Sequence, residues 1–286
     1  MLFRSGRELL VEVEIPRQGR TNVLVNKQRL ARTRDLVGVL RVTVFSPDDL
    51  ELVKGAPAER RRFVDEASVA LAIKNDALRL ELERVLRQRN TLLRQCGGRL
   101  AADTETTLDV WDERLATVGT EVGQVRASVL ARLQPMVEEA YQQLAGERLA
   151  VTLRYEPEWR RTGLASALRS ARQDDVRRGV STVGPHRDDV DLGLGALAAR
   201  THASQGEMRC LALSLRLAAH RLVAQETDAT PLLVLDDVLS ELDPDRCRAL
   251  LLNLPAGQVV ITTASPLPAA AHPDHVITIE SGRVVA

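Results

Sequence analysis

The sequence predicts an α/β protein with a long helical insertion. Four apolar residues, 232–235, run directly into Asp236 and Asp237, a pattern typical of a short strand buried on both faces, with charges where the strand emerges. Residues 258–263 form a second such run that ends in two threonines. Between about residues 59 and 129 the apolar side chains instead recur at three-four spacing, which indicates long helices.

We expect the helical insertion to be an arm that interrupts one sheet domain. The sheet domain would comprise residues 1–56 and 179–286, and the arm would comprise residues 57–178. Within the first part, residues 9–15 alternate apolar and acidic side chains, which predicts an antiparallel strand that pairs with the strand at 23–25. Further strands are expected at three places, namely residues 40–45, residues 149–155 and a hairpin at residues 275–285.

Two long helices of opposite charge should form the arm. Residues 57–100 carry ten Lys or Arg against six Asp or Glu, whereas residues 101–147 carry three against nine. Together with matching apolar seams, this predicts an antiparallel helix pair joined around residues 97–98. Arg89 interrupts the first seam, and Pro135 is expected to end the second helix because proline breaks the helical hydrogen-bond pattern. A shorter polar helix should follow at residues 164–178.

Composition excludes several classes of protein. The chain has 286 residues with 39 basic and 39 acidic side chains, so any nucleic-acid-binding surface must be local. Aromatic residues make up 2%, which argues against base-stacking platforms.

The cysteines give no sign of a metal or redox motif, because Cys96, Cys210 and Cys247 are far apart and form no Cys-x-x-Cys pair. The start lacks the apolar run of a signal peptide, and no window reaches the length of a membrane span, so we expect a cytoplasmic protein that does not enter a membrane.

Asp236 and Asp237 are the candidate catalytic residues. A carboxylate at the C-terminal end of a parallel strand lies beside phosphate-binding loops, so Asp236 would hold Mg²⁺ and Asp237 would orient a water molecule. The alternative is a solvated pair at a strand end. Asp243 and Pro244 then match the N-cap and the first position of a helix.

Ser204, Gln205, Gly206 and Glu207 begin an amphipathic helix. Ser204 and Glu207 have the spacing of a capping box, which explains both residues structurally. A helix that begins with Ser and Gly also presents free amides to an anion, so the same four residues suit a phosphate group. Both interpretations stay open.

Two further segments allow a structural and a functional interpretation. Arg60, Arg61 and Arg62 are most simply a solvated helix start, although three guanidinium groups together would also bind phosphates. The triplet 186–188, His-Arg-Asp, is similar to the kinase catalytic loop, but that loop needs Asn where this chain has Gly193. The kinase interpretation is therefore excluded.

Taken together, these motifs resemble the C-terminal half of an ABC-type ATPase head. In order they resemble the signature motif at 204–207, the Walker B strand, the D-loop at 240–243, and the switch position at 262–263. Asp in place of the usual Glu at 237, and the segment Gly-Pro-His-Arg-Asp-Asp at 184–189, narrow the resemblance to the RecF family of recombination mediators. The resemblance runs from about residue 9 to the C-terminus and implies an ABC-type head, incomplete at its N-terminus, with an inserted α-helical arm.

The resemblance implies a function as well as a fold. It implies ATP and Mg²⁺ as cofactors, an ATP-dependent homodimer, DNA as a partner, and action with RecO and RecR to load RecA at single-strand gaps and promote the SOS response. The resemblance also assigns roles: Asp236 would bind Mg²⁺, Asp237 would activate the attacking water, and Thr262 or Thr263 would sense the phosphate. The γ-phosphate held by the other protomer would be contacted by Ser204, Gln205, Gly206 and Glu207, and the D-loop residues Ser240 and Asp243 would lie at the dimer interface. His186 and Arg187 are candidate nucleotide or DNA contacts, and further candidate DNA contacts are Arg60, Arg61 and Arg62.

One departure from the family pattern stands out. The family begins with a strand and a P-loop, Gly-x-x-x-x-Gly-Lys-Ser/Thr, and no such motif occurs in these 286 residues. We expect either an incorrectly chosen start or a natural truncation, with weak or absent ATP binding and a head destabilised by an exposed sheet edge.

Two functions remain open on this sequence. One is an ATP-dependent DNA-repair mediator that is a slow ATPase, and the other is a non-hydrolysing module of the same family that binds DNA or a repair partner. A transporter ATPase subunit is disfavoured, because the helical insertion is too long and Ser-Gln-Gly-Glu departs from Ser-Gly-Gly-Gln.

Overall fold

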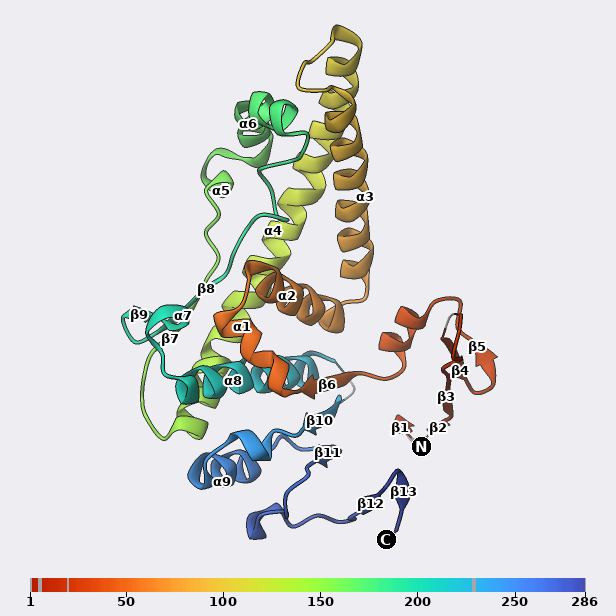
Figure 1. Ribbon diagram of the computed structural model, residues 1–286, viewed down its shortest axis with the longest axis vertical. Helices are drawn as coiled ribbons and strands as arrows, with labels where there is room; N and C mark the ends of the chain where they lie inside the picture. The colour runs from red at the N-terminus through yellow and green to blue at the C-terminus, as the bar shows by residue number, and fades with distance from the viewer. Residues whose placement is uncertain (1, 5–6, 20, 228–229, 286) are drawn as a thin grey trace.

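The computed structural model describes residues 2–4, 7–19, 21–227 and 230–285. Figure 1 shows an elongated molecule in which α3 (Lys74–Gln95), α6 (Leu164–Arg178) and the first half of α4 (Ala102–Ala145) extend away from the strands. The strands lie at the opposite end together with α8 (Gln205–Glu226) and α9 (Pro244–Leu252). Within the described residues, no helix combines the length and the apolar composition that a bilayer span requires.

A parallel three-stranded sheet holds the candidate carboxylates. Its order is β11 (Val259–Thr262), β10 (Leu232–Asp236) and β6 (Val42–Phe45), and Asp236 pairs with Thr262 in the register. The strand expected at 40–45 is therefore confirmed, as an edge strand of this parallel sheet.

The two faces of this sheet differ. Leu233 and Leu235 are 1% and 0% exposed and belong to the main core, whereas Val42, Val44 and Val260 on the opposite face are 44%, 46% and 40% exposed. On that face β11 exposes Val260, and Leu232 and Val234 of β10 are only half-buried, so the prediction that both strands are buried on both faces is wrong. Parallel sheets are normally covered on both sides.

The antiparallel helix pair of the arm is confirmed, because α3 and α4 pack along each other on either side of a turn with positive φ at Gly97 and Gly98. The helical region expected from 59 to 95 is two helices, however, since α2 (Pro57–Leu71) ends before α3 begins. Phe63 of α2 joins the main core and Val85 of α3 joins a separate core in the arm. The break lets the two apolar faces point to different neighbours.

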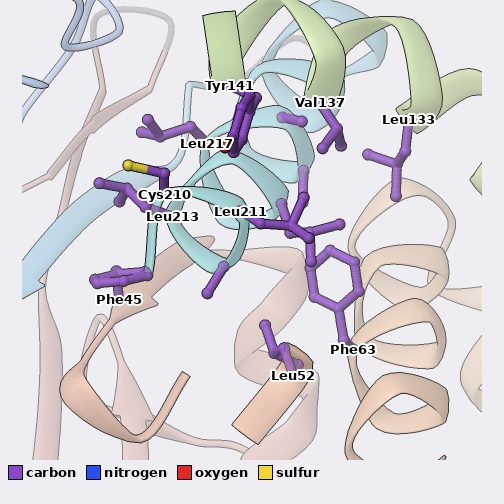
Figure 2. Close-up of a cluster of buried hydrophobic side chains, with 14 of the residues drawn as sticks. Phe45, Leu52, Phe63, Leu133, Val137, Tyr141, Cys210, Leu211, Leu213 and Leu217 are labelled. Carbon is purple, nitrogen blue, oxygen red and sulfur yellow. The ribbon is translucent and has the colours of Figure 1, made fainter. Parts of the chain in front are cut away.

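Pro135 does not end the second helix, because α4 continues through it to Ala145. Figure 2 shows Leu133, Val137 and Tyr141 of α4 facing α8, and all three are 0–1% exposed. A proline inside a helix costs roughly 3 kcal/mol. Burying a large apolar side chain contributes about 1.5–3 kcal/mol, so these three contacts outweigh that cost.

The other elements connect these parts. They are β1 (Leu2–Arg4), β2 (Arg7–Leu9), β3 (Val11–Glu14), β4 (Asn22–Val25), β5 (Gln28–Arg29), α1 (Glu51–Lys54), β7 (Val151–Arg154), α5 (Trp159–Thr162), β8 (Asp191–Leu194), β9 (Leu197–Ala198), α7 (Ala199–His202), β12 (Ile279–Glu280) and β13 (Arg283–Val284), with 3-10 turns at Thr33–Gly38, Pro47–Leu50, Leu239–Glu241 and Ala269–Ala271. The predicted antiparallel pairing of β3 with β4, the strand β7 and the hairpin of β12 with β13 are confirmed.

Candidate functional site

The ends of β10 and β11 bring Asp236 and Thr262 together. The Thr262 hydroxyl donates a hydrogen bond to Asp236 Oδ1 at 2.5 Å. Thr263 turns away, because its hydroxyl accepts from the Ser265 amide at 3.1 Å. Of the two threonines at the end of this strand, Thr262 is therefore the one beside the carboxylate.

Asp237 holds an unusual backbone conformation directly after the strand. Its φ is +51°, in the left-handed region that few residues with a side chain adopt. The Asp237 amide donates to the carbonyl and the hydroxyl of Thr262 at 3.1 and 3.2 Å, and the Ser240 hydroxyl donates to the Asp237 carbonyl at 2.8 Å. These bonds hold the sharp turn that places Asp236 and Asp237, both exposed, at the sheet edge.

This edge suits a magnesium ion bound together with a phosphate ligand. Asp236 and Thr262 offer a carboxylate and a hydroxyl side by side, and Mg²⁺ prefers oxygen ligands, usually one or two carboxylates completed by phosphates and water. Within the described part of the chain, no three His, Cys, Asp or Glu side chains are grouped to enclose a metal. An ion held by Asp236 would therefore take most of its ligands from outside the protein.

The predicted capping box at the start of α8 is confirmed. The Ser204 hydroxyl accepts from the Glu207 amide at 3.3 Å, and the Glu207 carboxylate accepts from the Ser204 amide at 2.7 Å. These hydrogen bonds lower the pKa of Glu207 below its usual value. The amides of Gln205 and Gly206 have no intrahelical acceptor, since the first bond of the helix runs from the Met208 amide to the Ser204 carbonyl, so this helix end can still bind an anion. The structural and the functional interpretations of the motif are thus compatible.

Two arginines link the start of α8 to the segment that follows β10. A Cβ atom at Gly206 would overlap the guanidinium of Arg246, which itself lies 3.4 Å from the Asp243 carboxylate. Arg209 forms an ion pair with Glu241 and donates to its carbonyl at 3.2 Å. Sequence reasoning missed both arginines, because neither belongs to a motif.

Asp243 and Pro244 begin α9 as predicted. Asp243 is the N-cap, and its side chain accepts from the Arg246 amide at 3.0 Å. The same residue thus caps α9 and holds Arg246 against Gly206. Residues 240–243 and residues 204–207 therefore lie next to each other.

Arg60 is not available to a phosphate clamp. Arg60 is 5% exposed, and its guanidinium donates to both carboxylate oxygens of Asp189 at 2.8 and 2.9 Å. Arg61 donates to the Asp188 carbonyl at 2.6 Å, and Arg62, although exposed, pairs with neighbouring glutamates. The expectation for Arg60 is corrected, because a buried and paired guanidinium has no surface to offer DNA.

His186 and Arg187 lie in the segment that connects α6 to β8. The His186 Nε2 lies 3.0 Å from the Ser181 carbonyl, which makes Nε2 the protonated nitrogen. Burial lowers the pKa of His186 to about 4, so its ring is neutral at neutral pH. Arg187 is exposed, and its Nε donates to the same carbonyl at 3.1 Å. Of the two, Arg187 has the more accessible side chain.

Buried ion pairs connect the helices of the arm to one another. Arg89 is 0% exposed and donates to Asp112 at 2.6 Å and to Asp175 at 2.7 Å. Arg126 donates to both oxygens of Asp65 at 2.8 Å. The interruption of the apolar seam at Arg89 was the sequence signal for this network, but it did not reveal the partners.

The chain is similar to known DNA repair proteins over nearly its whole length. It is 39% identical to "DNA replication and repair protein RecF" of Kineococcus radiotolerans over 99% of this chain and 81% of that protein. It is 41% identical to the protein of the same description from Streptomyces avermitilis, over 92% of this chain and 74% of that protein. No family model matches the chain.

Solved structures give the same result for the fold. A structure of the recombination mediator RecF with ATP in the RecFOR pathway covers 96% of this chain and 75% of its own, with a TM-score of 0.83 and 26% identity. An Smc head bound to the winged-helix domain of ScpA has a TM-score of 0.53 at 14% identity and shows likeness of fold alone. The predicted fold class, an ABC-type head with helices inserted, is confirmed.

Proposed function

This chain belongs to the RecF family of DNA replication and repair proteins, and we propose that it acts in recombinational repair of single-strand gaps through an ATP-dependent dimer. Its cofactors would be ATP and Mg²⁺, and it would work on DNA in the cytoplasm. The support is family membership together with likeness to a RecF structure that contains ATP.

The contact between Asp236 and Thr262 carries the proposal. It joins the end of a strand that supplies a carboxylate to the end of the next strand, which supplies a hydroxyl. Asp236 would hold Mg²⁺, the adjacent Asp237 would orient the attacking water, and Thr262 would respond to the phosphate. A water held by Asp rather than Glu is consistent with slow hydrolysis, because the side chain is one methylene shorter.

The start of α8 would act on a nucleotide held by a second protomer. Ser204 and the amides of Gln205 and Gly206 form a helix end that suits a γ-phosphate, and Glu207 caps that end. Ser240 and Asp243 would line the dimer interface close by, since Asp243 holds Arg246 against Gly206.

The partners we propose beyond DNA are RecR and RecO. With them the protein would load RecA at gaps and so promote the SOS response. The support is the RecFOR pathway named for the similar structure, together with family membership.

A second candidate is a non-hydrolysing module of the same family that binds DNA or a repair partner. It is favoured by the departure at Asp237, where the shorter side chain sets back the group that would activate water.

ATP hydrolysis separates the two candidates. We would measure hydrolysis by this chain and by a version extended with the P-loop segment that the family resemblance implies, each with Asp237→Asn and Ser204→Ala variants. An ATPase should show activity in the extended version that rises with the square of protein concentration when dilute and is lost with Asp237→Asn. DNA binding without any hydrolysis in either version would support the non-hydrolysing module instead.

A further inference from the structure

Four exposed arginines gather on one flank of the arm, and they differ from the other arginines around them. They are Arg87, Arg94, Arg178 and Arg187, which we call the arm arginine patch. Across the described residues, no carboxylate forms an ion pair with any of the four.

Two members of the patch lie on the same face of α3. Arg87 and Arg94 are seven residues apart, which is two helical turns, or about 10.5 Å along the axis. Asn90 lies between them on that face, and its side-chain oxygen accepts from the amide and the hydroxyl of Ser181 at 2.8 and 2.7 Å. The segment around Ser181 therefore lies against this face of α3.

The other two members reach the same place from the neighbouring segment. Arg187 donates to the Ser181 carbonyl at 3.1 Å. A Cβ atom at Gly179 would lie 3.4 Å from Cγ of Arg94, so Arg178, the preceding residue, is beside the end of α3. Arg187 therefore contacts Ser181 itself, and Arg178 lies beside the end of α3 that carries Arg94.

Buried hydrogen bonds hold the segment around Ser181 against α3. The buried Arg89 donates to the Ser181 hydroxyl at 2.8 Å and to Asp175 at 2.7 Å, and Asp175 in turn accepts from the Thr182 amide at 2.8 Å. Ser181 and Asp175 are both 0% exposed. The arginines therefore extend from a rigid surface rather than from a loose loop.

Two nearby arginines of α3 are paired with carboxylates, whereas the patch is a local positive charge on a chain whose net charge is zero. Arg79 pairs with Asp76 and Glu83, and Arg84 pairs with Glu81. Among the described residues, none of the exposed large apolar side chains lies on α3 or in residues 178–187. Protein interfaces usually have an apolar centre, so a purely polar, arginine-rich surface suits a nucleic acid better.

We propose that the arm arginine patch binds the sugar-phosphate backbone of DNA. This inference rests on the proposed function and gives it a location. Guanidinium groups bind phosphates through paired hydrogen bonds, and contacts to the backbone fix position without reading sequence. The binding is therefore independent of sequence and strongly dependent on salt.

The test is the salt dependence of DNA binding by the whole chain. We would titrate a fluorescein-labelled 30-base-pair duplex at several NaCl concentrations and follow anisotropy. For duplex DNA, log K falls with log salt, and each lost phosphate contact makes that slope less negative by about 0.9. We expect the slope of Arg87→Gln/Arg94→Gln to be less negative than that of the wild-type chain by about 1.8, and the slope of the triple variant with Arg187→Gln to be less negative by about 2.7. Because the double variant leaves the Ser181 contacts intact, it keeps the test valid if the triple variant unfolds.

Matched controls and three outcomes decide the result. Arg84→Gln and Arg177→Gln remove exposed arginines of the same region that are already paired, and they should leave the slope unchanged. A wild-type chain that binds duplex without any change in the double variant overturns the patch but not the proposed function. Failure of the wild-type chain to bind any DNA overturns both, and displacement of the duplex by poly-glutamate as readily as by unlabelled DNA would indicate an acidic protein partner instead.

Discussion

Replacing Arg89 by methionine should destabilise the arm severely. Arg89 is 0% exposed, and its guanidinium bonds to Asp112, Asp175 and the Ser181 hydroxyl at 2.6–2.8 Å. Methionine fills a similar volume, so the main loss is the charge and its hydrogen bonds. Asp175, also 0% exposed, would be left as a buried carboxylate without its cation.

The expected cost follows from that unpaired carboxylate. Removing one partner of a buried ion pair typically costs about 3–5 kcal/mol, a large fraction of the roughly 5–15 kcal/mol that stabilises a whole domain. Replacing the whole cluster by neutral side chains is far less harmful, because no charge is then left buried. The variant Arg89→Met/Asp112→Asn/Asp175→Asn should therefore recover part of the stability that Arg89→Met loses.

The measurement is the free energy of unfolding from urea denaturation, followed by circular dichroism. Arg84→Met is the control, since Arg84 lies on the same helix but is 64% exposed and pairs at 3.7 Å with Glu81. An exposed pair of this kind contributes about 0–1 kcal/mol. If Arg89→Met costs no more than Arg84→Met, or if the triple variant is less stable than Arg89→Met alone, the reasoning is refuted.

Two further predictions concern the signature helix and the effect of acid. Alanine is favoured over glycine in helices by up to about 1 kcal/mol, so Gly206→Ala should stabilise a protein that already carries Arg246→Ala. It should not stabilise the wild-type protein, because there the new Cβ overlaps Arg246. Equal effects on the free energy of unfolding in both urea titrations would contradict the contact. Burial lowers the pKa of both His186 and His220 from 6.5 to about 4, so the unfolded chain binds more protons between these values. The free energy of unfolding should keep the full contribution of these neutral histidines above about pH 6.5 and decrease towards pH 4, by at most about 3 kcal/mol per histidine. Urea titrations at each pH should show a smaller decrease for His220→Gln.

Local signals predicted local structure well. The capping box of Ser204 and Glu207 and the N-cap at Asp243 formed as expected, because a cap depends on residues within one turn. The helix expected at 164–178 agrees with α6 at both ends, since Gly163 and Gly179 lie on either side of it with positive φ.

Features that depend on distant parts of the chain were not predictable. Arg60 looked like a solvated helix residue, but Asp189, which is 129 positions away, makes it a buried ion pair. Pro135 looked like a helix end, yet packing of α4 on α8 carries the helix through it. Spacing along the sequence does not indicate that Arg60 would meet Asp189 or that α4 would pack on α8.

The candidate site was predicted in part. The sequence predicted carboxylates at the end of one strand and threonines at the end of another, and the structure places Asp236 beside Thr262 in adjacent strands. The choice between Thr262 and Thr263 depends on the strand register, and the contacts of Arg246 depend on how α9 packs beside α8. Both follow from tertiary structure, which explains why the sequence left them open.

We expect the buried arginine of the arm also to help set how its helices align. A seam of leucines and valines that repeats every seven residues can pair in more than one register, because each shift by a heptad again matches apolar with apolar. Arg89 removes that freedom, since in any shifted pairing its charge would be buried without Asp112. Buried polar groups often set register at a cost in stability. By aligning α3 with α4 and holding Ser181 in place, Arg89 determines where Arg87 and Arg94 face relative to Arg187.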